Sequence, residues 1–269
     1  MFQREAPLTL DFLRAHKKFP SVWCAGCGNG AVMSALIRAF YKVGLDKNKI
    51  VMVSGIGCSS RMPVYMDLNT VHTTHGRALP YATGIKLANP ELEVIVVMGD
   101  GDALAIGGNH FIHTARRNVS LTAIVINNRI YGMTGGQYSP ATPTGCYSTT
   151  SRYGNIDQPF DISKMATVAG AAYVARTSVY HVKEMENFIE KGIKRKGFSV
   201  SEVMSNCHTY FGRMNGVKTP QLMLNWFKDN TTLKPEEADT KILRGIFTDR
   251  DVHGFLGEHE KIVKMAQAK

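Results

Sequence analysis

The sequence predicts an α/β fold with a doubly wound, mostly parallel sheet. β-branched runs of strand length occur at 50–54, 94–98, 121–126 and 198–204, with a shorter one at 172–175. Segments between them, at 31–43, 162–169 and 182–196, repeat apolar residues with helical spacing. Several of these runs end in glycine or polar residues, and strands that alternate with helices favour a parallel sheet.

Length and composition limit the size of the domain and the expected location of the protein. The chain has 269 residues, of which 44% are hydrophobic, enough to bury a full core. We expect one large domain at 15–210, followed by a C-terminal extension at 211–269. No apolar run reaches the roughly 18 residues of a membrane span, and the N-terminus lacks the apolar region of a secretory signal. The expected location is therefore the cytoplasm, with no membrane partner.

The basic composition indicates attraction to anions. The formal net charge is +10 and the isoelectric point is near 9.4. The lysines and arginines are scattered and no nucleic-acid-binding motif is present, so nucleic acid is not favoured as a partner. Acidic substrates, phosphates or an acidic protein fit the charge equally well.

The stretch 94–128 predicts a binding site at one edge of the sheet. A strand at 94–98 runs into Gly99-Asp100-Gly101-Asp102, a crossover helix follows, and a second strand at 121–126 ends in Asn127-Asn128. Because the carboxyl ends of parallel strands share an edge, Asp100 and Asn128 are expected to converge. A carboxylate, an amide oxygen and a main-chain carbonyl form a ligand set suited to Mg²⁺.

The spacing within this stretch makes the site more specific. An isolated Gly-Asp-Gly is compatible with a simple turn whose Asp caps a helix. Here 25 residues, 102–126, separate it from Asn-Asn, and this pattern resembles the thiamine diphosphate motif. The glycine-rich loop 129–137 offers backbone N–H groups and a threonine hydroxyl to an anion. The Ser-, Thr- and Pro-rich segment 138–160 is predicted to be a long loop of the kind that forms lids.

The cysteines suggest a metal centre. The chain has five cysteines, and without an export signal they argue against a disulfide framework. Cys24 and Cys27 form a CxxC motif at a helix start, which alone fits a redox pair, half of a zinc site or part of an iron–sulfur site. Cys58 and Cys207 each follow a strand, although a single cysteine there could be an ordinary buried side chain. Four thiolates suit zinc or an iron–sulfur cluster, and spacing does not separate the two. We interpret Cys146, in the long loop, as a spare thiol.

Six motifs occur together in the order WCAGCGNG, GIGCSSR, THGRALPYATG, GDGD, INNRIYGMTGGQ and SNCHTYFGR. With them, the sequence resembles the β subunits of the 2-oxoacid:ferredoxin oxidoreductases from about residue 15 to about residue 230. The resemblance implies a thiamine-diphosphate-binding, pyrophosphate-type domain that carries a 4Fe-4S cluster.

The resemblance also implies roles for individual residues. The cluster ligands would be Cys24, Cys27, Cys58 and Cys207, and Mg²⁺ would be held by Asp100, Asn128 and the carbonyl of Ile130. Cofactor contacts would come from Ile56, Gly57, Cys58, Ser59, His75, Gly101, Asp102, Gly132, Met133 and Thr134. His75 precedes a predicted helix, although a single histidine is more often structural. Arg61 would meet the substrate carboxylate, where many relatives have lysine, and an arginine can bind it through two parallel hydrogen bonds.

The implied reaction is the oxidative decarboxylation of a 2-oxoacid, or its reverse. Electrons would pass through the cluster to ferredoxin, and coenzyme A would take the acyl group. An α subunit would have to supply the pyrimidine-type domain and the activating glutamate, and the expected assembly is (αβ)₂. The segments 207–213 and 223–228 resemble the 2-oxoglutarate enzymes more than the pyruvate enzymes. The first alternative is the same chemistry on pyruvate or branched-chain 2-oxoacids. Two others are a cluster-free thiamine diphosphate decarboxylase subunit and a zinc-stabilised module that binds nucleic acid.

Overall fold

A seven-stranded sheet forms the centre of the computed structural model, which describes residues 10–16, 20–252 and 254–268. Its strand order is β2-β1-β3-β4-β6-β5-β9, and all neighbouring strands are parallel except the β5–β9 pair. The strands are β1 Ile50–Ser54, β2 Asn69–His72, β3 Glu93–Gly99, β4 Thr122–Asn127, β5 Tyr173–Ser178, β6 Ser199–Met204 and β9 Gly245–Asp249. The predicted doubly wound, mostly parallel sheet is confirmed.

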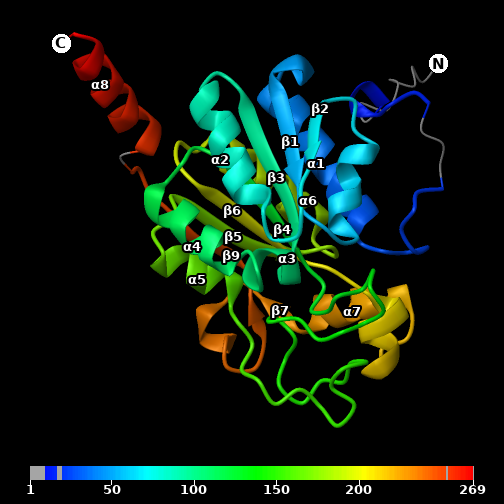
Figure 1. Cartoon of the computed structure of the whole chain (residues 1–269). Coiled ribbons are helices and arrows are strands. Elements are labelled where there is room, and N and C mark those ends of the chain that lie inside the picture. The colour runs from blue at the N-terminus through cyan, green and yellow to red at the C-terminus, as the bar shows by residue number, and fades with distance from the viewer. Residues whose placement is uncertain (1–9, 17–19, 253, 269) are drawn as a thin grey trace.

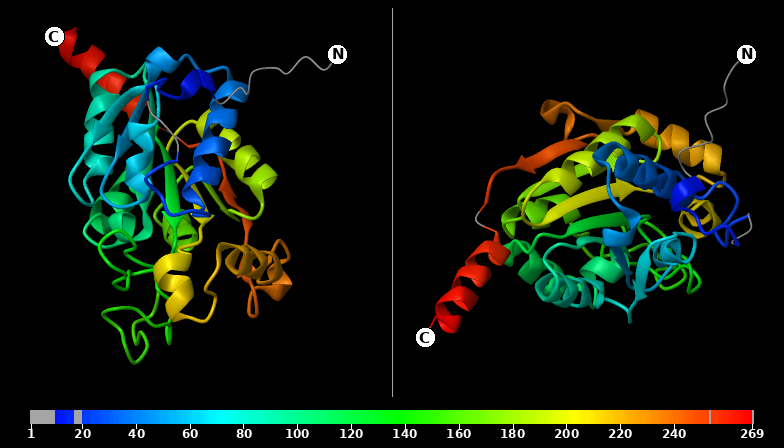
Figure 2. Two further views of the ribbon diagram at one scale, coloured as in Figure 1. Left: turned by 90° about the vertical axis from the view of Figure 1, so that its right-hand side faces the viewer. Right: turned by 90° about the horizontal axis from the view of Figure 1, so that it is seen from above.

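Helices cover both faces of the sheet (Figures 1 and 2). One face packs against α1 (Asn29–Val43) and α6 (Val182–Lys194), which also contact each other. The other face packs against α2 (Ala78–Ala88), α3 (Asp100–Leu104), α4 (Gly108–Arg117) and α5 (Ile162–Val168). A sheet covered by helices on both faces is what parallel strands require, because neither face is left in water.

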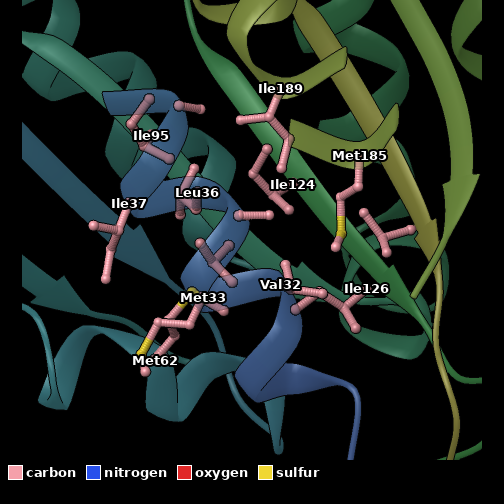
Figure 3. Close-up of a cluster of buried hydrophobic side chains, with 14 of the residues drawn as sticks. Val32, Met33, Leu36, Ile37, Met62, Ile95, Ile124, Ile126, Met185 and Ile189 are labelled. Atoms are coloured by element: carbon pink, nitrogen blue, oxygen red, sulfur yellow. The ribbon is translucent and has the colours of Figure 1, made fainter. Parts of the chain in front are cut away.

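Alternating side chains along each strand build two separate cores. On β3, Ile95 and Val97 point to the α1 and α6 face, while Val94, Val96 and Met98 point to the opposite face. Figure 3 shows the first core, in which Leu36 of α1 lies over the sheet near Ile95 and Ile124, with Ile189 of α6 alongside. Both faces of the central strands are therefore apolar, which explains their nearly continuous β-branched sequence.

The structure differs from the predicted elements in places that have physical causes. The crossover after β3 consists of two helices rather than one, because the helical conformation is interrupted between Ala105 and Gly107. The backbone at Gly107 passes so close to Asp102 that a side chain at 107 would lie 2.2 Å from the Asp102 carbonyl oxygen. Gly-Asp-Gly is therefore not a turn before a helix but the start of α3 itself. The short polar edge strand β2 was not predicted, and β5 extends beyond 175 because Arg176 is buried in an ion pair.

The C-terminal part adds elements around the sheet. It contributes α7 (Pro220–Asp229), the short pair β7 (Thr231–Thr232) and β8 (Ile242–Leu243), β9 and α8 (Phe255–Gln267). β9 pairs antiparallel with β5 and closes one side of the sheet, whereas α8 projects from the body (Figures 1 and 2). Among the helices of the described residues, none combines the length and apolar character needed to cross a bilayer.

Candidate cofactor-binding site

A cleft of about 480 Å³ opens at the carboxyl edge of the sheet, where β1, β3 and β4 end. Its volume lies within the range of about 300–1,000 Å³ typical of ligand pockets. Every predicted cofactor contact and magnesium ligand lines it: Ile56, Gly57, Cys58, Ser59, His75, Asp100, Gly101, Asp102, Asn128, Ile130, Gly132, Met133 and Thr134. Sequence reasoning missed Asn29, Gly99, Ile126, Tyr131 and Gln137, which also line the cleft.

Asp100 is the buried anion of the cleft. Asp100 is the first residue of α3, directly after β3, and it is only 2% exposed. Burial raises the pKa of Asp100 to about 6, although a hydrogen bond from Ser139 Oγ and backbone N–H groups favour the charged form. No lysine or arginine forms an ion pair with Asp100 among the described residues. A buried carboxylate of this kind is suited to a hard cation such as Mg²⁺.

Asn128 and Ile130 bring two more oxygens to the same side of the cleft. Both follow β4, the strand next to β3 in the sheet, so the predicted convergence with Asp100 is confirmed. Asn128 Oδ1 accepts a hydrogen bond from the Ile130 backbone nitrogen at 3.1 Å, which folds the loop back on itself. The carboxylate, the amide oxygen and the nearby carbonyl together fit the all-oxygen coordination of magnesium.

Asp102 organises the opposite wall. Its Oδ1 accepts the Gly76 backbone N–H at 2.6 Å and lies 2.8 Å from His75 Nδ1. Burial raises the pKa of Asp102, and the hydrogen bonds from Gly76 and His75 oppose that shift. The carboxylate lies so close to the end of β1 that a Cβ at Gly55 would be 1.9 Å from Asp102 Oδ2. Asp102 therefore fixes the His75 ring at the cleft and requires glycine at 55.

Tyr131 connects the two walls. Its hydroxyl donates to the Gly101 carbonyl at 3.3 Å, and its ring packs edge-on against His75 with centroids 5.8 Å apart. Burial, together with the charges of Asp100 and Asp102, raises the pKa of Tyr131 to about 12, so the phenol stays protonated and can donate. Its place between two predicted site residues, Ile130 and Gly132, was the signal that could have identified it.

The four predicted cluster cysteines gather beside the cleft. A Cβ at Gly132 would lie 3.3 Å from Cys207 Sγ and 3.9 Å from Cys58 Sγ. Burial, together with the charges of Cys58, Cys207 and Cys24 as thiolates, raises the pKa of Cys27 to about 12. Burial likewise raises the pKa of Cys58 to about 11, with Cys207 and Cys24 adding to the shift. The four thiols are close enough to repel one another when ionised, so a cationic centre is needed to hold them as thiolates.

The loop that carries the CxxC motif is held from three sides. Trp23 Nε1 donates to the Cys58 carbonyl at 2.7 Å, and Asn206 Nδ2 donates to the Gly26 carbonyl at 2.8 Å. On the third side Pro220 packs so tightly that a Cβ at Gly26 would lie 2.5 Å from it. Three segments distant in sequence thus position this loop, and Cys24 is its exposed member.

Two other predicted residues lie outside the cleft lining. Arg61 is exposed, one short helical turn beyond Cys58, and its backbone nitrogen donates to the Cys58 carbonyl at 3.3 Å. Cys146 packs against the cluster of Ile130, Phe211 and Met223, which Cys207 also contacts, but Cys146 does not contribute to the pKa shifts of the other cysteines. Within the described ranges, no group of three or more His, Cys, Asp and Glu side chains converges closely enough to hold a single metal ion, so the four neighbouring thiols do not form a mononuclear metal site.

Comparisons with known proteins agree with this geometry. Residues 55–203 match the family model described as "Thiamine pyrophosphate enzyme, C-terminal TPP binding domain". The match begins directly after β1, runs into β6, and contains the Asp100 and Asn128 side of the cleft. The fold and the cleft are therefore those of a thiamine pyrophosphate enzyme.

Relatives define the family more narrowly. The chain is 49% identical over 257 residues to the 2-oxoglutarate synthase subunit KorB of Methanothermobacter thermautotrophicus, covering 93% of this chain and 89% of that protein. It is 46% identical over 267 residues to the subunit of the same name in Methanocaldococcus jannaschii, covering 97% and 98%. A solved 2-oxoglutarate:ferredoxin oxidoreductase from Magnetococcus marinus, with 2-oxoglutarate, coenzyme A and succinyl-CoA bound, superimposes with a TM-score of 0.87 at 31% identity, covering 98% of this chain and 92% of that one.

These similarities extend over nearly the whole chain. The chain belongs to the family of 2-oxoacid:ferredoxin oxidoreductase β subunits that includes the 2-oxoglutarate synthase KorB subunits. The resemblance found in the sequence motifs is thereby confirmed.

The crowding at Gly55 leads to a prediction. In Gly55→Ala the new methyl would overlap the Asp102 carboxylate, so we expect a loss of about 1–3 kcal/mol in the free energy of unfolding. Urea denaturation followed by circular dichroism measures this loss. Gly84→Ala in α2 is the matched control, because nothing lies within 4 Å of its new Cβ and alanine favours a helix by about 1 kcal/mol. Equal stability of the two variants would contradict the role assigned to Gly55.

Proposed function

We propose that this chain is the half of a 2-oxoglutarate:ferredoxin oxidoreductase that holds the diphosphate of the cofactor and an iron–sulfur cluster. The reaction is 2-oxoglutarate and coenzyme A to succinyl-CoA and CO₂, with two electrons passed singly to ferredoxin, or the reverse. The observation that carries the proposal is the meeting, at one sheet edge, of a magnesium-type oxygen set with four mutually interacting thiols. A cluster-free thiamine enzyme would leave these thiols unused.

Thiamine diphosphate fits the cleft in this proposal. Asp100, Asn128 and the Ile130 carbonyl would hold Mg²⁺ beside the diphosphate, and the backbone N–H groups of residues 132–134 would be available to the phosphate oxygens. When bound, the cofactor supplies the carbanion that attacks the keto carbon and the electron sink that lets CO₂ leave. His75 and Tyr131 would border the ring end of the cleft, fixed there by Asp102 and the Gly101 carbonyl.

A 4Fe-4S cluster fits the four thiols. Cys24, Cys27, Cys58 and Cys207 come from three separate loops. The raised pKa values of Cys27, Cys58 and Cys207 would be offset if ferric and ferrous ions bound the sulfurs. Cys58 lines the cleft, so it lies where electrons would leave the cofactor, and the exposed Cys24 lies toward solvent. All five cysteines are free, as expected in the reducing cytoplasm that we propose as the location.

Substrates and partners follow from the same family. The solved relative binds 2-oxoglutarate, coenzyme A and succinyl-CoA, and 2-oxoglutarate carries two carboxylates that suit a chain of net charge +10. Ferredoxin is proposed as the electron partner, and its generally acidic surface suits the same charge. An α subunit is required because a thiamine enzyme also needs a pyrimidine-type domain with an activating glutamate, and we propose an (αβ)₂ assembly.

The decisive experiment tests the complex and the isolated chain side by side. Anaerobically purified complex of this chain with its α subunit should contain iron, sulfide and thiamine diphosphate. It should reduce ferredoxin faster with 2-oxoglutarate than with pyruvate or 2-oxoisovalerate, whereas the isolated chain should have no turnover. A preference for pyruvate or 2-oxoisovalerate would contradict the proposed substrate. Robust turnover by the isolated chain would contradict the proposed need for an α subunit.

The cysteines supply a second prediction, with a matched control in the same chain. Cys207→Ser should lose most of the iron and sulfide and the broad absorbance near ~400 nm expected of a cysteine-ligated cluster. Cys146→Ser should retain both, because Cys146 packs among apolar side chains and does not contribute to the pKa shifts of the other cysteines. Equal iron content in the two purified complexes, or zinc in place of iron, would count against the cluster.

Arg61 supplies a third prediction. If its guanidinium binds a substrate carboxylate, Arg61→Met should raise the KM for 2-oxoglutarate by roughly 10- to 100-fold, since a charge-assisted hydrogen bond contributes about 1.5–3 kcal/mol. Arg61→Lys should show a smaller rise because it keeps the charge but loses the two-pronged geometry. Arg250→Met, an exposed arginine just beyond β9, is the control. An unchanged KM in Arg61→Met would remove Arg61 from the substrate site.

A further inference from the structure

The loop that carries two of the proposed magnesium ligands contains an unusual residue between them. Arg129 lies between Asn128 and Ile130 and has a positive φ of 64°. Apart from Asn118, it is the only residue other than glycine with a positive φ among the described residues. Side chains disfavour this left-handed region, so something must hold Arg129 there.

The Arg129 side chain is held by aromatic rings rather than by an acid. Its guanidinium carbon lies 4.9 Å from the Trp226 ring centroid and 5.9 Å from that of Phe211. In the described part of the chain it forms no salt bridge. Burial lowers the pKa of Arg129 to about 10, so it remains a cation at neutral pH. A guanidinium stacked on tryptophan in a desolvated position is a favourable cation–π contact.

The backbone of Arg129 is also fixed on both sides. Its nitrogen donates to Asn127 Oδ1 at 3.1 Å, and its carbonyl accepts a hydrogen bond from Thr142 Oγ1 at 2.6 Å. These contacts come from β4 and the long loop, whereas Trp226 comes from α7 in the C-terminal extension. The side-chain stack is therefore an independent third restraint on the loop.

A cavity beside the Arg129–Trp226 stack offers space into which the Arg129 side chain could move if Trp226 were truncated. The cavity is about 150 Å³ and is lined by Asn128, Arg129, Cys146, Phe211 and Trp226, among others. Truncating Trp226 would enlarge this space and leave the guanidinium free to turn into it. Because Asn128 lines the same cavity, the loop that presents its amide oxygen could then relax.

We infer that Trp226 and Arg129 are positioning residues for magnesium: the cation–π stack from α7 holds Arg129 in its left-handed conformation, and thereby aims the Asn128 amide and the Ile130 carbonyl at Asp100. The inference rests on the proposed function, since it assumes that these oxygens bind Mg²⁺. It gives the C-terminal extension a role in cofactor binding, although the extension supplies no lining residue to the cleft.

Calorimetric titration of Mg²⁺ and thiamine diphosphate into the metal-stripped complex tests the inference. Trp226→Ala should weaken Mg²⁺-dependent binding by roughly 10-fold, the usual effect of losing a residue that orients metal ligands. Trp226→Phe, which keeps an aromatic face, should recover most of the affinity. Leu222→Ala is the matched control, because Leu222 is on the same helix but is 52% exposed, and it should leave the affinity unchanged.

A double-mutant cycle separates positioning from general packing of α7. Glycine adopts the left-handed conformation without strain, so in an Arg129→Gly background Trp226→Ala should cause no further loss. An equal loss in both backgrounds, or no loss in Trp226→Ala alone, would overturn the inference. If the wild-type complex binds no thiamine diphosphate with Mg²⁺, the proposed function fails as well, and the two failures are thereby distinguished.

Discussion

A buried carboxylate at the end of the central strand is the constraint on which the site depends. Asp100 is almost fully enclosed, and the hydrogen bonds it accepts do not fully compensate for the loss of water, because its pKa stays raised to about 6. A cation is the partner that this position lacks within the described chain. The arrangement around Asp100, with oxygens from the neighbouring strand end and N–H groups from a glycine-rich loop, is therefore understandable as a shell for a metal and its phosphates.

A buried polar network around Glu202 holds the end of β4, which leads into the loop with Asn128 and Ile130. Asn127 Nδ2 donates to Glu202 Oε1 at 2.9 Å, while Ser163 Oγ and Arg176 Nε donate to Oε2 at 2.6 and 2.8 Å. Burial alone would raise the pKa of Glu202, but the Arg176 charge and these hydrogen bonds outweigh it and hold the pKa below the usual value. The network joins β4, β5, β6 and α5. Asn127, directly before Asn128, is therefore held by side chains of the sheet and α5 rather than by the loop.

Sequence motifs predicted the parts of the site whose chemistry depends on residue type and local spacing. The strand ends at Asp100, Asn128 and Cys58 could be predicted because parallel strands bring their carboxyl ends to one edge. Contacts between distant segments could not: the stack of Arg129 on Trp226 joins residues 97 positions apart, and no local pattern encodes it. The edge strand β2 escaped prediction because it is short and half exposed, without the apolar signal of the central strands.

The arrangement of the thiols suggests a path for electrons between the cofactor cleft and the protein surface. Cys58 is shared between the two halves of the site, since it lines the cleft and its carbonyl receives the Trp23 indole from the CxxC loop. Cys24, at the other end of the group, is exposed to solvent. A cluster held by these thiols would touch the cofactor cleft on the Cys58 side and the surface on the Cys24 side. An acceptor need only reach the Cys24 face, so it could dock without opening the cleft to water, where a reactive carbanion would be protonated. In the proposed complex, this separation would keep water from the reacting carbon while electrons leave at the Cys24 face.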